Sequence, residues 1–232
     1  MVGSALRIWL NYAVPLTLLS AIALSPLILV ALRVRIPADA AAAKSVLSLG
    51  WTLLAAAWLG QLVLVGGASA MVGAPSQLRA IGAGFIQLLR AVVPCLVAAL
   101  AVVLCTLALV VPGPVLLVLL SLTGASRERG LPAPLLDSIA AARRQLPAVV
   151  LAVAAMLALD AAIGLVAYRV LIASPAKVVP LVATRSFVRA IALALAIVSP
   201  LPATVLALLH ARGTSTRARV SAFSRSGGEL AR

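Results

Sequence analysis

The chain has 232 residues, of which 64% are apolar and 10% are charged, and its mean hydropathy is +1.20. A soluble globular chain is about 45–50% apolar and about 25% charged, so the composition excludes an ordinary water-soluble domain. The net charge of +14 does not indicate nucleic-acid binding, because the basic residues lie between apolar runs rather than in one patch beside aromatic side chains.

Five apolar runs divide the chain, and each is long enough to cross a bilayer. A helix of about 18–20 residues spans the hydrocarbon layer. Because an unpaired backbone amide in lipid costs several kcal/mol, such runs must close their hydrogen bonds within helices. We therefore predict an all-α, polytopic transmembrane helix bundle over residues 1–211. The runs cover residues 8–32, 46–66, 91–126, 148–168 and 190–210.

The first run begins like a signal peptide, with a basic residue before an apolar centre. It is too long for one, and Arg33 and Arg35 stop it, so we expect a retained first span. The small residues of PADAAAAK at 37–44 leave cleavage open as the alternative.

Two amphipathic stretches, 75–90 and 131–146, predict helices that lie along the membrane surface. They resemble each other after a shift of 58 positions, which hints at a repeated unit. The predicted apolar stripe of the first comprises Leu78, Ile81, Phe85 and Leu88. That of the second comprises Leu135, Ile139, Ala142 and Leu146, and the residues that avoid it are Asp137, Ser138, Arg144 and Gln145.

A helix break is predicted at Pro112, Gly113 and Pro114, because the prolines lack backbone donors and the triplet favours a turn. The apolar residues 115–126 that follow give only about 18 Å of helix. Two interpretations stay open. Residues 114–126 either cross the membrane as a short helix with local thinning, or re-enter and turn back against neighbouring helices.

The distribution of basic residues places the C-terminus in the cytoplasm. Six crossings with the N-terminus inside and five with it outside each leave about 12 basic residues inside, so the count does not choose between them. Residues 212–232 are basic and rich in Ser and Gly, which is typical of a disordered cytoplasmic tail held near anionic lipid headgroups. The basic residues expected at the lipid interface are Arg143, Arg144, Arg212, Arg217 and Arg219.

The order of these parts resembles a bacterial membrane family, the one that includes the multi-span domain attached to some glycerophosphodiester phosphodiesterases. The matching features are VVPGP at 110–114 and the amphipathic PLLDSIAAARRQL at 134–146, within residues 45–170. The resemblance implies a bundle with six crossings in the bacterial cytoplasmic (inner) membrane. It does not imply hydrolase activity, because these residues contain no catalytic barrel. The acidic residue that often precedes the second surface helix in that family corresponds only loosely to Glu128.

Asp160 lies almost at the centre of the 148–168 run, where a carboxylate costs about 2.5–3.5 kcal/mol on insertion scales. Gly164 shares its helical face, and small residues let a neighbouring helix come close, so Asp160 is expected to face into the bundle. We expect it to be protonated and to donate a hydrogen bond to Gln61, to Thr106 or to a backbone carbonyl freed near Pro112. An interhelical tie and a proton-linked or substrate-contacting role are both open.

No catalytic arrangement stands out. GASA at 67–70 is half of an intramembrane serine protease motif, and a lone His210 is too little for a metal or haem site. We therefore predict no enzyme activity and no cofactor. The expected function is that of a non-catalytic membrane subunit or scaffold that assists a partner protein or a lipid process. The alternative is a small transporter or lipid-moving protein that uses Asp160 and the broken segment at Pro112–Pro114.

Overall fold

The computed structural model describes residues 2–33, 42–72, 76–108, 112–128, 130–173 and 180–213, and every regular element within them is a helix. After a one-residue interruption at Ser199, the final helix continues over 200–213. The predicted tail boundary at residue 212 therefore falls within its last turn, and residues 214–232 lie outside the described part. The elements are α1 Val2–Asn11, α2 Ala13–Ala23, α3 Ser25–Arg33, α4 Ala42–Val72, α5 Gln77–Ala108, α6 Pro112–Leu120, the 3₁₀ turn η1 Thr123–Ala125, α7 Pro132–Arg144, α8 Leu146–Ala173 and α9 Pro180–Val198.

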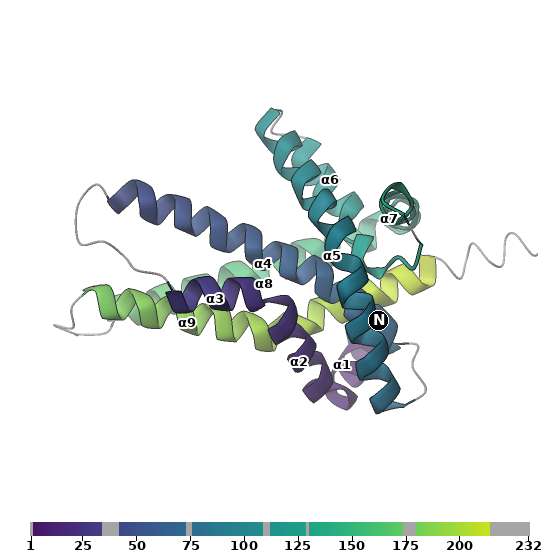
Figure 1. Ribbon diagram of the computed structural model, residues 1–232, viewed down its shortest axis with the longest axis horizontal. Coiled ribbons are helices and arrows are strands. Elements are labelled where there is room, and N and C mark those ends of the chain that lie inside the picture. The colour runs from purple at the N-terminus through teal and green to yellow at the C-terminus, as the bar shows by residue number, and fades with distance from the viewer. Residues whose placement is uncertain are drawn as a thin grey trace, which may run out of the picture.

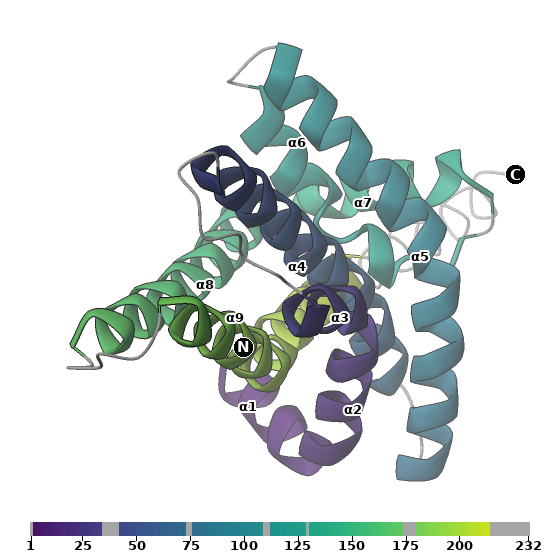
Figure 2. The ribbon, with the colours of Figure 1, turned by 60° about the vertical axis from the view of Figure 1, so that its left-hand side comes forward.

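The helices form a bundle from which one hairpin diverges. In Figure 1, α3, α4, α8 and α9 run along the long direction of the molecule, and α5 crosses them with α6 at its side. Figure 2 shows α5 and α6 standing away from α8 and α9. The most extensive packing joins α4 to α5 and α5 to α6, while α3 contacts both α4 and α9. Helix α4 is therefore the element shared by the two parts.

Within the part of the chain that the structure describes, three helical segments are long and apolar enough to span a membrane: Leu78–Ala108, Leu146–Val166 and Arg189–Gly213. A fourth span results if Ala5–Asn11 and Ala13–Ala23, which meet at an angle of 90°, form one broken crossing. Many large apolar side chains point outward, such as Leu107 (80% exposed) and Leu151 (71%). A surface of this kind is stable in lipid and not in water. The chain is accordingly a helical membrane protein.

Helix α5 differs from the prediction of a surface helix followed by a separate span, because it is unbroken from Gln77 to Ala108. Pro94 lies inside it without ending it. The predicted apolar stripe mostly faces outward, with Leu78 86% exposed, and only Leu88 of that stripe is buried. Small residues face the bundle instead, because in lipid the helices gain from close backbone approach rather than from hiding large side chains. The small residues buried on this face are Ala80, Gly84, Ala91, Cys95 and Ala98.

The predicted helix break falls where α5 ends, and the Pro-Gly-Pro triplet itself begins α6. Proline suits the first turn of a helix, since its missing N–H would have no partner there. Helix α6 then returns along α5. Gly113 lies against Thr106 near the end of α5, and Leu120 packs on Ala98, two turns earlier in α5. Residues 112–126 thus run antiparallel to the second half of α5.

The return segment ends in a close backbone contact with α4. At Gly66, a Cβ atom would lie 2.5 Å from the Gly124 carbonyl oxygen and 2.9 Å from the Ala91 Cβ. At Gly124, a Cβ atom would collide with the Leu62 carbonyl oxygen of α4. Only glycine permits this approach, so α4, α5 and η1 meet at one backbone-to-backbone junction.

Replacing Gly66 with alanine should destabilise the protein by about 1–3 kcal/mol, because the added methyl group must displace backbone atoms of η1. Reversible unfolding in mixed detergent micelles, followed by far-UV circular dichroism, measures the change. Gly82→Ala is the matched control. A Cβ atom at Gly82 meets nothing within 4 Å, so alanine should be neutral or stabilising by up to about 1 kcal/mol. Equal effects of the two substitutions would contradict the junction.

Candidate functional site

The intramembrane carboxylate of Asp160, in α8, is paired with Gln61 in α4. The Gln61 side-chain amide donates to both Asp160 carboxylate oxygens, each at 2.9 Å. The same nitrogen lies 3.3 Å from the Ser199 hydroxyl oxygen. Gln61 is 2% exposed, whereas Asp160 is half-buried. These three side chains join α4, α8 and the end of α9 by polar contacts.

Two Ser-Pro pairs interrupt helices close to this cluster, and Ser199 of the second pair belongs to it. Ser25 and Pro26 follow Leu24, which separates α2 from α3, and Ser199 and Pro200 follow α9. Because proline lacks an N–H, it leaves the carbonyl four residues earlier without its helical donor. Gly60, beside Gln61, lies against Leu24 and the Ala23 carbonyl. The repeated Ser-Pro-Leu at 25–27 and 199–201 is the sequence signal that could have located this cluster.

The structure brings together two of the three polar residues predicted to interact. Gln61 contacts Asp160 as donor, so the carboxylate accepts the hydrogen bond that it was expected to donate. Thr106 lies elsewhere. Its hydroxyl group donates to the Val102 carbonyl at 2.7 Å, and its side chain is exposed beside Gly113. A close neighbouring helix was expected at Gly164, but among the described residues a Cβ atom there would meet nothing within 4 Å.

A second polar cluster docks α7 against the end of the last helix. The Asp137 carboxylate lies 3.0 Å from His210 Nε2, and both side chains are largely buried. The Gln145 amide donates to the Leu209 carbonyl at 3.1 Å. The Arg144 guanidinium donates to the Gly213 carbonyl at 3.0 Å. Terminal carbonyls of a helix have no donors within it, so Arg144 caps the last described turn of this helix, and Gln145 adds a donor to a carbonyl one turn earlier.

Both sides of α7 contact protein. Asp137 and Gln145, which avoid the predicted apolar stripe, face the protein as well. So does Ser138, whose hydroxyl donates to the Leu119 carbonyl at 2.7 Å. Of the predicted stripe, Leu135 and Ile139 pack against the cluster that contains Leu120, and Ala142 is buried, whereas Leu146 is 44% exposed. An amphipathic pattern shows that a helix has a polar and an apolar face. It does not show whether the polar face forms hydrogen bonds with water or with the end of another helix.

The basic residues predicted at the lipid interface are only partly placed. Arg143, Arg144 and Arg212 are exposed at α7 and at the end of the last helix. Arg144 uses one nitrogen as the cap described above. Arg217 and Arg219 lie outside the described residues.

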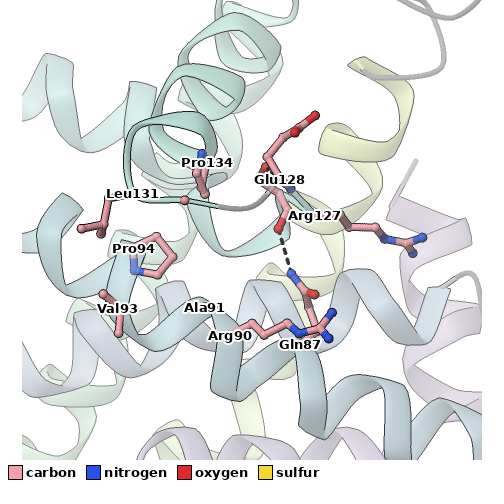
Figure 3. A pocket seen from close by; sticks show the side chains of 11 residues that line it. Gln87, Arg90, Ala91, Val93, Pro94, Arg127, Glu128, Leu131 and Pro134 are labelled. Carbon is pink, nitrogen blue, oxygen red and sulfur yellow. Dashed lines mark hydrogen bonds between the residues drawn. The ribbon is translucent and has the colours of Figure 1, made fainter.

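A cavity of about 340 Å³ opens between α5 and residues 126–128 and 130–134. Its wall is tied together by Gln87, whose amide donates to the Ser126 carbonyl at 2.8 Å (Figure 3). Two arginines line it, Arg90 from α5 and Arg127 from the segment after η1. The sequence alone did not predict this cavity, because Arg90 and Arg127, which line its two sides, are 37 residues apart in the chain.

Comparisons of the chain with protein-family models, with curated proteins and with solved structures find no match. The resemblance to the phosphodiesterase-associated membrane domain stays a prediction. The class of protein, a helical membrane protein, rests on the apolar helices and their outward-facing side chains.

A double-mutant cycle tests the contact between Asp160 and Gln61. Each single substitution to leucine should destabilise the protein by about 1–3 kcal/mol, since it leaves the buried partner unsatisfied. The double variant should lose less than the sum, with a coupling of about 1 kcal/mol. Thr106→Val serves as the control and should change stability by less than about 0.5 kcal/mol. Strictly additive effects would show that the two side chains do not interact.

Removing the polar cluster of α7 should loosen this helix while the rest of the bundle stays folded. In Asp137→Ala and Gln145→Ala, backbone amides of residues 132–144 should open with a free energy about 1–3 kcal/mol lower. Hydrogen exchange read by mass spectrometry measures this locally. Arg143→Ala, on the exposed side of the same helix, should leave the exchange unchanged. Slow exchange in all three variants would mean that apolar contacts alone hold α7.

Proposed function

We propose that this chain is a non-catalytic integral membrane protein of a bacterial cytoplasmic membrane, with six crossings and a cytoplasmic C-terminus. The six segments are α1–α3, α4, α5, α6 with η1, α8, and α9 with its continuation to Gly213. One of these segments, α6 with η1, is short, since its apolar helix covers only Pro112–Ala125, whereas α4 has 31 residues. Local thinning of the bilayer accommodates short spans at modest cost.

The arrangement of helix ends supports this topology. In Figure 1, the end of α3, the start of α4, the end of α8 and the start of α9 gather at one end of the molecule. Helix α7 and the end of the last helix lie at the other. The antiparallel return of α6 brings Arg127 to the same cavity as Arg90. Under the positive-inside rule, this basic end with Arg143 and Arg144 is cytoplasmic. Residues 114–126 then cross rather than re-enter.

The function that we propose is structural support for a partner membrane protein or a lipid process. The observation that supports this proposal is the hydrogen bonding of the intramembrane carboxylate of Asp160. Asp160 is bound through both oxygens by Gln61, so it ties α8 to α4 across the bundle. A polar group satisfied in this way gives helices a defined register in lipid, where apolar contacts are nearly equivalent in every orientation.

A second candidate, a small transporter or lipid-moving protein, is favoured by a different observation. Asp160 is only partly buried and shares the Gln61 amide with Ser199, at the Ser199–Pro200 interruption. Trp58, one turn before Gln61, buries an indole N–H that has no acceptor among the described residues. Ionisable groups next to interrupted helices are typical of transport pathways. In this protein the pathway would not include Pro112–Pro114, because Gly113 packs on Thr106 and not on Asp160.

Cysteine accessibility separates the two functions. In a background with Cys95 and Cys105 replaced by alanine, we introduce Asp160→Cys or Gly164→Cys and apply a membrane-impermeant maleimide to vesicles. The scaffold predicts no labelling, because no water reaches these positions. Transport predicts labelling of both. Ser76→Cys, on an exposed residue before α5, is the reactive control, and Leu165→Cys, on the outward apolar surface, is the lipid-facing control.

A further inference from the structure

We propose that the cavity between α5 and residues 126–128 and 130–134 binds an anionic phospholipid, with the headgroup phosphate at Arg90 and Arg127 and an acyl chain against Val93 and Leu131. The proposal uses the membrane topology given above. It does not depend on whether the protein is a scaffold or a transporter, and none of these four residues belongs to the Asp160 cluster.

The cavity has two chemically different ends. Figure 3 shows the side chains of Arg90 and Arg127 extending toward the same side, next to Gln87. At the opposite side lie Leu131 and Val93. A guanidinium group binds phosphate oxygens through paired N–H donors, and two of them suit a phosphate better than one. The ligand that matches both ends is an amphiphile with an anionic head.

Glu128, the acidic residue that lines the cavity, does not cancel the preference for an anionic ligand. In Figure 3 the Glu128 side chain turns away from α5, where Arg90 is based. Its backbone N–H lies 3.3 Å from the Ser126 hydroxyl oxygen, which helps to orient the segment that carries Arg127. The charged groups that remain toward α5 are therefore cationic.

The depth of the cavity fits a headgroup. Residues 91–108 of α5 contain no charged side chain and measure about 27 Å as a helix, close to the hydrocarbon thickness of about 30 Å. Arg90 consequently stands at the membrane interface. Because α6 and η1 run back along α5, Arg127 lies at the same depth in the membrane as Arg90.

The apolar end of the cavity continues onto a lipid-facing surface. Val93 is 55% exposed, and Leu89, Leu96 and Leu100 on the same side of α5 are each more than half exposed. Leu131 is 49% exposed across from them. An acyl chain can therefore run from the cavity along α5 without leaving the hydrocarbon. This continuity is the reason for assigning a phospholipid rather than a soluble phosphate.

The cavity is held in shape by contacts that do not involve the arginines. Gln87 is buried and donates to carbonyl oxygens of Ser126 and Gly124, at 2.8 and 3.4 Å. Ala91 leaves room at the base, because its side chain is a single methyl group. Both arginine side chains are exposed, so replacing them removes charge without opening the core.

Binding is tested with the full chain in phosphatidylcholine nanodiscs, to which dioleoyl phosphatidylglycerol is added at increasing mole fraction, with bound lipid counted by native mass spectrometry. We expect phosphatidylglycerol to be retained about tenfold more tightly than phosphatidylcholine, and the preference to vanish in Arg90→Gln/Arg127→Gln. The matched control is Arg79→Gln/Arg143→Gln, which removes two exposed arginines outside the cavity and should keep the preference.

The other outcomes overturn the proposal. Equal loss in both double variants would mean that diffuse basic charge attracts the lipid. Displacement by soluble glycerol phosphate would mean an anion site that does not recognise a lipid. No preference in the unaltered chain would remove the site altogether. Arg127→Gln alone, in a segment outside any helix, provides the same comparison if the double variant does not fold. All of these results are independent of the maleimide labelling at Asp160.

Discussion

Close backbone approach at Gly66 and Gly124 is the contact on which the rest of the structure depends. Lipid tails are as apolar as leucine side chains, so helices in a bilayer associate through dense packing and polar contacts rather than by hiding apolar surface. The two glycines let η1 touch α4, and Ala91 lets α5 join the same junction. This contact fixes where the α6 return ends. It therefore also fixes the position of Arg127 relative to Arg90.

Polar side chains fix how each helix is rotated about its axis, which contacts between small residues alone do not fix. Gln61 faces α8 and α9 from one side of α4, while Gly66, less than two turns later, faces η1. Helix α4 thus holds both parts of the bundle at once. At the other end, Arg144 caps the last helix, Gln145 donates to its Leu209 carbonyl, and Asp137 contacts His210. Each of these contacts joins segments far apart in the chain, so each restricts how the helices can rotate.

The lipid-facing surface and the proposed lipid cavity are continuous. Large apolar side chains cover the outside of α5, and the cavity opens beside them at the level of Arg90. The proposed site for one lipid headgroup is the arginine pair. The Asp160 cluster lies inside the bundle, and its polar groups form hydrogen bonds with one another.

The sequence by itself determined that the chain is helical and lies in lipid, because backbone solvation is a local property that an apolar run cannot avoid. It also determined the helix end before Pro112 and identified Gln61 among three possible partners of Asp160. It did not determine that α5 is continuous, that the polar side of α7 faces protein, or that Arg90 meets Arg127. Those features depend on what lies opposite each face. Amphipathic periodicity is the same whether a polar face meets water or a helix end, so only the tertiary structure decided them.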